Sequence, residues 1–142
     1  MKTTNTATAS YEGLGKAGKG HVATKSGALD HPYGFNTRFE DAPGTNPEEL
    51  IAAAHASCFT MALSFALEKA GHTDGRLDTK AEVTLEKDGD GFTVTKSALS
   101  LTGKVAGIDE AEFEKLAKEA KANCPISKLL DTEITLETKF ES

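Results

Sequence analysis

The chain has 142 residues, a net charge of −6 at pH 7, 38% hydrophobic residues and 27% charged residues. This length and composition predict one soluble globular domain over residues 1–142, large enough to bury a core without disulfides. The negative charge and the scattered basic residues exclude a nucleic-acid-binding surface and a surface for anionic membranes. The first residues, "MKTTNTATASYEG", lack an apolar signal core, so we expect a cytoplasmic protein.

The N-terminal third indicates a hairpin followed by a loop. Small, β-branched and polar residues alternate between glycines in the first 30 residues, and "TATASYE" and "HVATKSG" are typical of the two strands of a β-hairpin. The next stretch, "HPYGFNTRFEDAPG", is rich in turn formers, and we expect a loop there.

A long helix is predicted from residue 46 to residue 70. Asn46 is a favourable N-cap, Pro47 suits the first helical position, and Glu48 and Glu49 stabilise the first turn. Gly71 ends the helix. Because the helix is apolar almost all round, we expect it to be buried and enclosed by other elements. We do not expect a membrane span, because polar residues interrupt the apolar run at His55, Ser57, Thr60 and Ser64.

The rest of the chain shows strand signals and helix signals in separate long blocks. "KAEVTLEKDGDGFTVTKSALSLTGKV" predicts two strands joined by a turn at "DGDG". A second helix begins after its N-cap Asp109, with Glu112 at the third helical position. "CPISKLL" opens a short third helix, and "TEITLETKFE" is a final strand. Because strands and helices are segregated, the fold class is α+β.

The two cysteines, Cys58 and Cys124, are too few for a disulfide scaffold, so they are inert, bind a metal or take part in redox chemistry. Cys124 occupies the N-cap position of the short third helix, with Pro125 at the first helical position. A helix N-terminus stabilises a thiolate, so the pKa of Cys124 should fall. The alternative is that Cys124 only caps the turn.

Cys58 lies about three turns into the central helix, too far from either helix end to gain from the helix dipole. Buried apolar surroundings would raise its pKa, so the alternative to a reactive thiol is a small hydrophobic residue packed in the core. For Cys58 to react, a positively charged partner must come from elsewhere.

The chain has only two arginines, Arg38 and Arg76. Arg76 lies in the polar turn "HTDGR" and is expected in solvent, whereas Arg38 lies between aromatic residues in "PYGFNTRF" and should be partly enclosed. A guanidinium can hold a carboxylate with two hydrogen bonds and direct other N–H groups at a thiolate or a peroxide oxygen. The alternative for Arg38 is a surface ion pair.

The two glutamates of the central helix have different expected roles. Glu49, at the third helical position, can reach back to the N-cap, whereas the carboxylate of Glu48 is free to bind an arginine. Ten residues of helix correspond to a rise of about 15 Å, so Glu48 cannot reach Cys58 of the same helix. If Glu48, Arg38 and Cys58 share a site, a second helix or a second subunit must bring them together.

Two other chemistries use the same residues. His55 and Cys58 lie three residues apart on one helix face and could bind zinc with Cys124, but this supplies three of the usual four ligands. His55 can equally be a core or interface histidine with its hydrogen bonds satisfied. A Cys–His hydrolase would need an orienting Asn or Asp and an oxyanion hole, which the sequence does not indicate.

These motifs together resemble the OsmC family, which is related to the organic hydroperoxide resistance proteins. The resemblance runs in order through "GKG", "PYGFNTRFE", "GTNPEELIAAAHASCF", "AGIDEAEF", "CPIS" and "EITLE", and so covers most of the chain. In the hydroperoxide resistance branch the arginine lies nearer the N-terminus. No arginine precedes Arg38 here, which indicates the OsmC branch.

The resemblance implies a fold with an antiparallel β-sheet and a long buried central helix, assembled as an intertwined homodimer with active sites at the subunit interface. It implies a thiol-dependent peroxidase in which Cys58 is the peroxidatic cysteine and Cys124 the resolving one. Arg38 would activate the thiolate and Glu48 would orient Arg38. No cofactor is implied; an external dithiol, such as a lipoyl-type one, would reduce the disulfide.

The apolar residues beside Cys58, including Phe59 and Met61, lead us to expect a pocket that favours organic hydroperoxides over hydrogen peroxide. The alternative to an enzyme in stress defence is a non-enzymatic homodimeric protein that binds an apolar ligand, or senses stress, through the same pocket.

Overall fold

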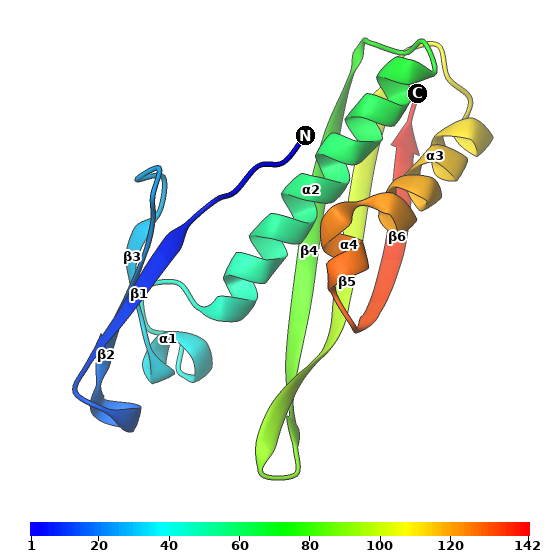
Figure 1. Ribbon diagram of the computed structural model, residues 1–142. Coiled ribbons are helices and arrows are strands. Elements are labelled where there is room, and N and C mark those ends of the chain that lie inside the picture. Colours follow the sequence, from blue (N-terminus) through cyan, green and yellow to red (C-terminus); the bar gives the residue numbers. More distant parts are fainter. The chain divides into compact units, whose positions relative to one another are not determined.

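The computed structural model describes residues 1–142 (Figure 1). Contacts within the chain divide it into two compact units, Met1–Leu50 and Ile51–Ser142. The boundary falls inside the long helix α2 (Pro47–Lys69), whose first turn belongs to the first unit. The single domain over residues 1–142 stays a prediction.

The first unit contains a three-stranded antiparallel sheet in the order β1-β2-β3. The predicted hairpin is confirmed: β1 (Ala7–Glu12) pairs with β2 (Lys19–Thr24), and the short 3-10 helix η1 (Gly15–Ala17) connects them. The predicted loop was wrong in part, because it contains strand β3 (Asp30–Tyr33) and helix α1 (Phe35–Phe39).

Both missed elements depend on contacts that local sequence patterns do not display. Strand β3 is held by its backbone pairing with β2. Helix α1 is only five residues long, and the Thr37 hydroxyl holds its start by accepting a hydrogen bond from the Gly34 N–H at 2.8 Å. A helix this short has no apolar periodicity to reveal it.

The second unit contains a sheet in the order β4-β5-β6, made of β4 (Gly75–Asp88), β5 (Gly91–Val105) and β6 (Glu133–Glu141). The hairpin at "DGDG" is confirmed, with β4 and β5 antiparallel. The expected antiparallel sheet needs one correction, because β6 runs parallel to β5. The segment between them forms helices that return the chain to the same end of the sheet, as parallel strands require.

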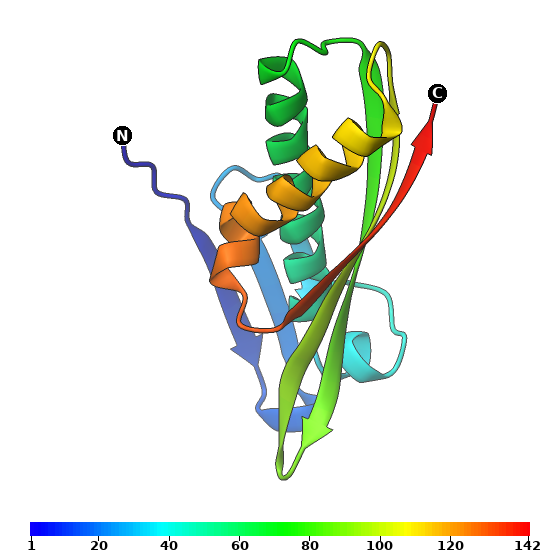
Figure 2. The same cartoon turned by 90° about the vertical axis from the view of Figure 1, so that its right-hand side faces the viewer.

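These helices are α3 (Glu110–Asn123) and α4 (Pro125–Leu129), and both were predicted. The Asp109 side chain caps α3 by accepting a hydrogen bond from the Glu112 N–H at 2.8 Å, as expected from the sequence. Within the second unit, α2, α3 and α4 lie on one face of the sheet (Figures 1 and 2).

The core of the second unit lies between this sheet face and the helices. Alternate side chains of β5 are buried from Ser97 to Val105, whereas the outward side chains of β4 are exposed and include Arg76, Asp78 and Lys80. The sheet therefore has one apolar face and one solvated face, the usual arrangement when helices cover only one side. The buried hydrophobic cluster includes Phe59, Leu63, Leu67, Leu99, Leu101, Phe113, Ala117 and Cys124.

Helix α2 is buried on one side only within the single chain, which corrects the expectation of a fully enclosed helix. Its buried residues are His55, Phe59, Leu63 and Leu67, spaced four apart, as one helix face requires. On other faces Met61 and Phe65 are 59% and 64% exposed. By length and composition α2 is also long and apolar enough to cross a membrane. This is weak evidence, because the core helix of a soluble protein passes the same test.

A close approach between α3 and β5 yields a test of this core. A Cβ atom added at Gly103 in β5 would lie 2.2 Å from the ring of Phe113, which is fully buried and cannot move aside. We predict that Gly103→Ala lowers the free energy of unfolding by about 1–3 kcal/mol, because overpacking forces side chains off their preferred positions. Urea denaturation followed by circular dichroism measures this.

Gly91→Ala in the same strand is the matched control, because a Cβ atom there meets its nearest neighbour at 3.9 Å, an ordinary contact. Equal stabilities for the two variants would contradict the packing of α3 on β5.

Candidate active site

Arg38 and Glu48 form an ion pair with two hydrogen bonds within the first unit. Arg38 donates from Nε to Glu48 Oε1 and from Nη2 to Glu48 Oε2, both at 2.8 Å. The Glu48 side chain is 12% exposed and that of Arg38 34%, so the pair is shielded on the carboxylate side. The hydrogen bond with Glu48 raises the pKa of Arg38, which keeps the guanidinium charged. The pairing proposed from the sequence is therefore observed.

The start of helix α2 fixes Glu48 in position. The Asn46 side chain caps the helix by accepting from the Glu49 N–H at 2.9 Å, and it donates to the Thr37 carbonyl of α1 at 3.1 Å. Glu49 has a local role, as expected, but with a different partner: it accepts from the Thr45 hydroxyl at 2.8 Å. The cap thus joins the helix that carries Arg38 to the helix that carries Glu48.

Aromatic side chains surround Arg38. The guanidinium carbon lies 5.5 Å from the centre of the Phe39 ring, a cation–π distance. A cavity of about 360 Å³ lies beside the arginine. Four of its nine lining residues are aromatic, and the full lining is Tyr11, Gly15, Lys16, Tyr33, Gly34, Phe35, Arg38, Phe39 and Pro47. The sequence analysis placed Arg38 between aromatics but did not identify Tyr11 or Lys16, which come from a distant segment.

Cys58 and Cys124 come together in the second unit, although 66 residues separate them. Cys58 is half-buried on α2, and Cys124 is fully buried between α3 and α4. Both are free thiols; Cys58 packs against the buried cluster that contains Cys124, and each thiol shifts the pKa of the other. The sequence implied this pairing only through the family resemblance, and the fold supplies it directly.

The two thiols have opposite pKa shifts. Burial raises the pKa of Cys58, and the hydrogen bond with Cys124 raises it further. Burial also acts to raise the pKa of Cys124, but the hydrogen bonds from Cys58, Ser127 and the Ile126 N–H outweigh burial and lower it. The Cys124 sulfur makes no capping bond of regular geometry, yet the start of α4 still supplies these donors. Cys124 is thus the better thiolate of this pair, and Cys58 lacks a cation within its own unit.

His55 is a fully buried histidine with both ring nitrogens occupied. Nδ1 lies 2.6 Å from the Ser97 hydroxyl of β5, and Nε2 lies 2.8 Å from the Ser127 hydroxyl of α4. The zinc alternative gains no support here, because both nitrogens are hydrogen-bonded to serine hydroxyls. No group of three or more His, Cys, Asp or Glu side chains could hold one. The hydrolase alternative also lacks support, because His55 is oriented by serines and not by Asn or Asp.

The expected pocket around Cys58 needs a correction. Phe59 is fully buried in the core, whereas Met61, on an exposed face of α2, lines a surface hollow together with Ser57 and Thr60. The cavity beside Arg38 offers further apolar surface.

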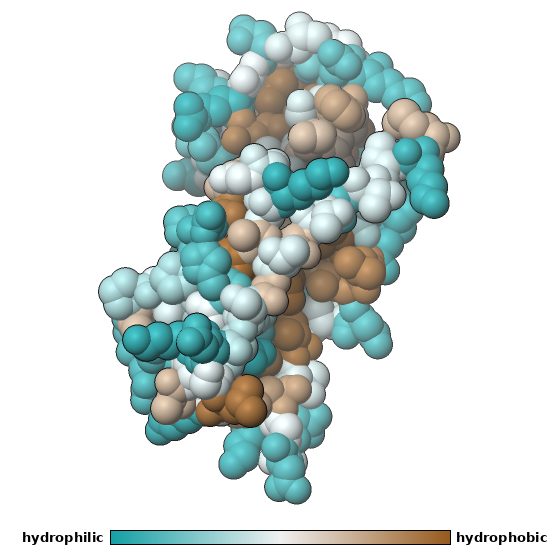
Figure 3. All heavy atoms as spheres, turned by 60° about the vertical axis from the view of Figure 1, so that its left-hand side comes forward, coloured by the Kyte–Doolittle hydropathy of each residue, from teal (hydrophilic) through white to brown (hydrophobic).

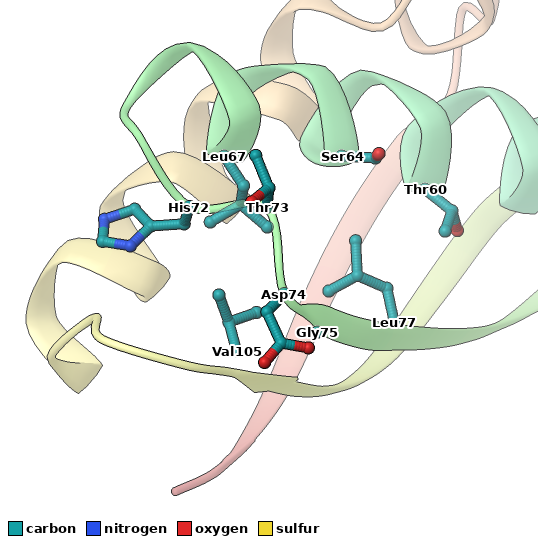
Figure 4. A pocket seen from close by; sticks show the side chains of 9 residues that line it. All are labelled: Thr60, Ser64, Leu67, His72, Thr73, Asp74, Gly75, Leu77 and Val105. Carbon is teal, nitrogen blue, oxygen red and sulfur yellow. The ribbon is translucent and has the colours of Figure 1, made fainter.

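Another cavity, of about 260 Å³, lies between the C-terminal half of α2 and the start of β4 (Figure 4). Its walls include Thr60, Ser64, His72 and Asp74, and it contains none of the predicted site residues. We assign it no part in the chemistry of the cysteines.

Comparisons with known proteins agree with the residues assembled above. The family model described as OsmC-like protein matches residues 39–139. The chain is 53% identical over 135 residues to the peroxiredoxin OsmC of Escherichia coli (strain K12), covering 94% of each chain. It is 33% identical over 120 residues to an organic hydroperoxide resistance protein-like protein of Staphylococcus aureus (strain MSSA476), covering 84% of each.

Among solved structures, the organic hydroperoxide resistance protein OhrB of Bacillus subtilis is similar with a TM-score of 0.69 and 30% identity, covering 94% of this chain and 98% of that one. The higher identity to an OsmC than to the hydroperoxide resistance-like protein agrees with the position of Arg38. The family match spans most of the chain. It begins at Phe39, directly after Arg38, and includes Glu48 and both cysteines. This chain belongs to the OsmC family.

Proposed function

We propose that this chain is a thiol-dependent peroxidase that reduces organic hydroperoxides, and hydrogen peroxide more slowly, in defence against oxidative and osmotic stress. The observation that carries the proposal is the proximity of two free cysteines, since Cys58 packs against the buried cluster that contains Cys124 and each thiol shifts the pKa of the other. Two thiols placed in this way can form a disulfide without a large rearrangement. Family membership supports the same activity.

The reaction proceeds in three steps. The Cys58 thiolate attacks the peroxide O–O bond, which breaks, leaving a Cys58 sulfenic acid and an alkoxide that takes a proton to become the alcohol. The Cys124 sulfur then attacks the Cys58 sulfur, the S–O bond breaks, and water leaves as the disulfide forms. An external dithiol reduces the disulfide by exchange and is itself oxidised. We propose a lipoyl-type dithiol as that donor, and no cofactor.

Cys58 needs help to ionise, because burial and the Cys124 hydrogen bond raise its pKa. Arg38 can supply this help. Its bonds with Glu48 use Nε and Nη2, which leaves the Nη1 N–H groups to hydrogen bond a thiolate or a peroxide oxygen. A positive charge close to a thiol favours the thiolate and lowers the thiol pKa. Glu48 then acts as the residue that orients the guanidinium.

The chain is proposed to work as an intertwined homodimer with active sites at the subunit interface. Ten residues of one helix separate Glu48 from Cys58, so the Arg38–Glu48 pair of one subunit would serve Cys58 of the other. The exposed apolar side of α2, with Met61 and Phe65, supports a second copy as the covering partner. Hydrophobic side chains reach the surface of the single chain in several places (Figure 3).

The aromatic cavity beside Arg38 supports the preference for organic peroxides. Its ring-lined walls suit an alkyl or aryl group better than they suit water or hydrogen peroxide. A cytoplasmic location belongs to the same proposal, since a reducing compartment keeps both cysteines as thiols between turnovers.

Thiol titration after peroxide treatment tests the proposal. We predict that one equivalent of cumene hydroperoxide removes both free thiols of the wild-type chain. Cys58→Ser should keep its remaining thiol, because Cys124 alone makes no sulfenic acid. Cys124→Ser should lose its thiol and accumulate a sulfenic acid that dimedone traps. Unchanged thiols in the folded wild type would contradict a peroxidase and leave the non-enzymatic binding protein as the explanation.

Replacing Arg38 tests the activation of Cys58. We predict that Arg38→Met slows the oxidation of Cys58 by about 100-fold or more, because the transition state loses its positively charged donor. Arg76→Met is the matched control: Arg76 also makes two hydrogen bonds with a carboxylate, that of Asp78, but on an exposed strand. Stopped-flow measurement of thiol oxidation gives both rates, and that of Arg76→Met should match the wild type.

Mixing two inactive variants tests where Arg38 acts. A heterodimer of Arg38→Met and Cys58→Ser contains one site with both residues intact if Arg38 serves the partner's cysteine. Refolding the variants together should then restore about a quarter of wild-type activity, because half of the dimers are mixed and each has one working site. No recovery in a mixture shown to contain heterodimers would place Arg38 and Cys58 of one site in the same subunit.

A further inference from the structure

The buried His55 has no role in the steps described so far. Its side chain is fully buried, and so is that of Ser97, while Ser127 is 8% exposed. No buried polar side-chain atom lacks a hydrogen-bond partner, so the arrangement is fully satisfied. Burying a histidine between two serines costs desolvation that a purely apolar residue would avoid, which calls for a reason beyond packing.

Ser127 links His55 to the resolving cysteine. Its hydroxyl lies 2.8 Å from His55 Nε2, and the same side chain acts on Cys124 and lowers the pKa of that thiol. Ser127 is the third residue of α4 and Cys124 is the N-cap, so both side chains lie at the start of this helix. A continuous chain of polar contacts therefore connects the Cys124 sulfur, the Ser127 hydroxyl and the imidazole.

The direction of this chain depends on a single proton. A serine hydroxyl has one hydrogen to donate, so Ser127 donates either to the His55 nitrogen or to the Cys124 sulfur. When Cys124 is a thiol, it donates to Ser127, which donates to Nε2. When Cys124 is a thiolate, it accepts from Ser127, which accepts from a protonated Nε2. Moving between the two arrangements transfers the thiol proton to His55.

We propose that His55 is a positioning residue for disulfide formation, which accepts the proton of Cys124 through the Ser127 hydroxyl as Cys124 attacks oxidised Cys58. The inference rests on the proposed function and extends it to the second step. His55 does not touch the reacting sulfur and acts through Ser127.

The step balances without a further reactant. The Cys124 S–H bond breaks as its proton moves to Ser127 and the Ser127 proton moves to Nε2. The Cys124 sulfur then forms the S–S bond with Cys58, and the S–O bond of the sulfenic acid breaks. His55 then releases the proton that it received. The departing hydroxide takes up one proton and becomes water, so the protons balance. Cys58 is reduced from sulfenic acid to disulfide while Cys124 is oxidised from thiol to disulfide.

The surroundings of His55 suit a proton acceptor. Burial lowers its pKa, which keeps the ring neutral near pH 7 and able to take up a proton transiently. The element β5 presents the Ser97 hydroxyl to the ring and α4 presents Ser127. The titratable groups connected to it are Cys124, through Ser127, and Cys58, one helical turn along α2.

The test is the pH dependence of disulfide formation. The wild-type chain is oxidised with one equivalent of cumene hydroperoxide, and loss of the sulfenic acid is followed by dimedone trapping between about pH 6.5 and 8. An internal proton acceptor should make the wild-type rate nearly independent of pH in this range. His55→Gln and Ser127→Ala should slow the step by about tenfold or more at pH 7, with a rate that rises about tenfold per pH unit as the thiol ionises in solvent.

Two serine variants are the controls. Ser127→Thr keeps a hydroxyl and should restore the flat profile. Ser97→Ala removes a hydroxyl that also bonds His55 but leaves the contacts between His55, Ser127 and Cys124 intact. The pH profile of disulfide formation in this variant should therefore stay flat, whatever the rate. A double variant, His55→Gln with Ser127→Ala, should be no slower than Ser127→Ala alone, because both changes break the same chain.

A pH profile of Ser127→Ala that stays as flat as that of the wild type would overturn the inference, as would a Ser97→Ala profile as steep as that of Ser127→Ala. The Ser127 and Ser97 variants decide the question even if His55→Gln does not fold. If wild-type Cys58 forms no sulfenic acid at all, the proposed function fails instead.

Discussion

The structure depends on one stripe of helix α2 that packs against one face of a sheet. His55, Phe59, Leu63 and Leu67 recur every four residues and are all buried, and the inward side chains of β5 meet the helices across the core. A four-residue repeat covers a narrow face, so the neighbouring residues of the helix lie at the edge of the core and not inside it. Cys58 is such an edge residue. It is half-buried and packs against the core from its edge.

This position explains why the two thiols differ. Cys124 lies at the start of α4, where N–H groups and the Ser127 hydroxyl lower its pKa. Cys58 lies in the middle of a long helix, has no such donors beyond the Ile126 N–H, and has a raised pKa. A peroxidase in which Cys58 attacks first therefore requires an additional positive charge. The Arg38–Glu48 pair provides a guanidinium that is held by two 2.8 Å hydrogen bonds and still has N–H groups to offer. The half-covered α2 supports a second copy as the means of bringing the two pairs together.

Much of the fold follows from local sequence signals, because caps and turns act over a few residues. Asn46 and Asp109 cap their helices as predicted, and "DGDG" turns the long hairpin. The parallel pairing of β6 could not be predicted in this way, since it depends on how two intervening helices return the chain to β5. The one-sided burial of α2 was also missed, because an apolar helix does not reveal whether its own chain or another copy covers it.

The candidate site, too, could be predicted where local sequence signals act and not where distant residues meet. The Arg38–Glu48 pair could be inferred, since both residues had a chemical reason to pair and lay near each other in sequence. The partners of His55 could not, because Ser97 and Ser127 lie 42 and 72 residues away and carry no motif. The organic-peroxide pocket was predicted from Phe59 and Met61. Helix periodicity places Phe59 in the core, whereas Met61 lines a hollow on the exposed side of α2.

The central claim is that Cys58 and Cys124 form one catalytic pair. Peptide mass spectrometry of the chain, digested under non-reducing conditions after one equivalent of cumene hydroperoxide, tests it most directly. The account predicts one cross-linked species that joins the peptides containing Cys58 and Cys124 and lacks the mass of two hydrogen atoms, and that reverts to two peptides with a dithiol. Oxidation confined to Cys124, or both cysteines recovered as unmodified thiols, would contradict it.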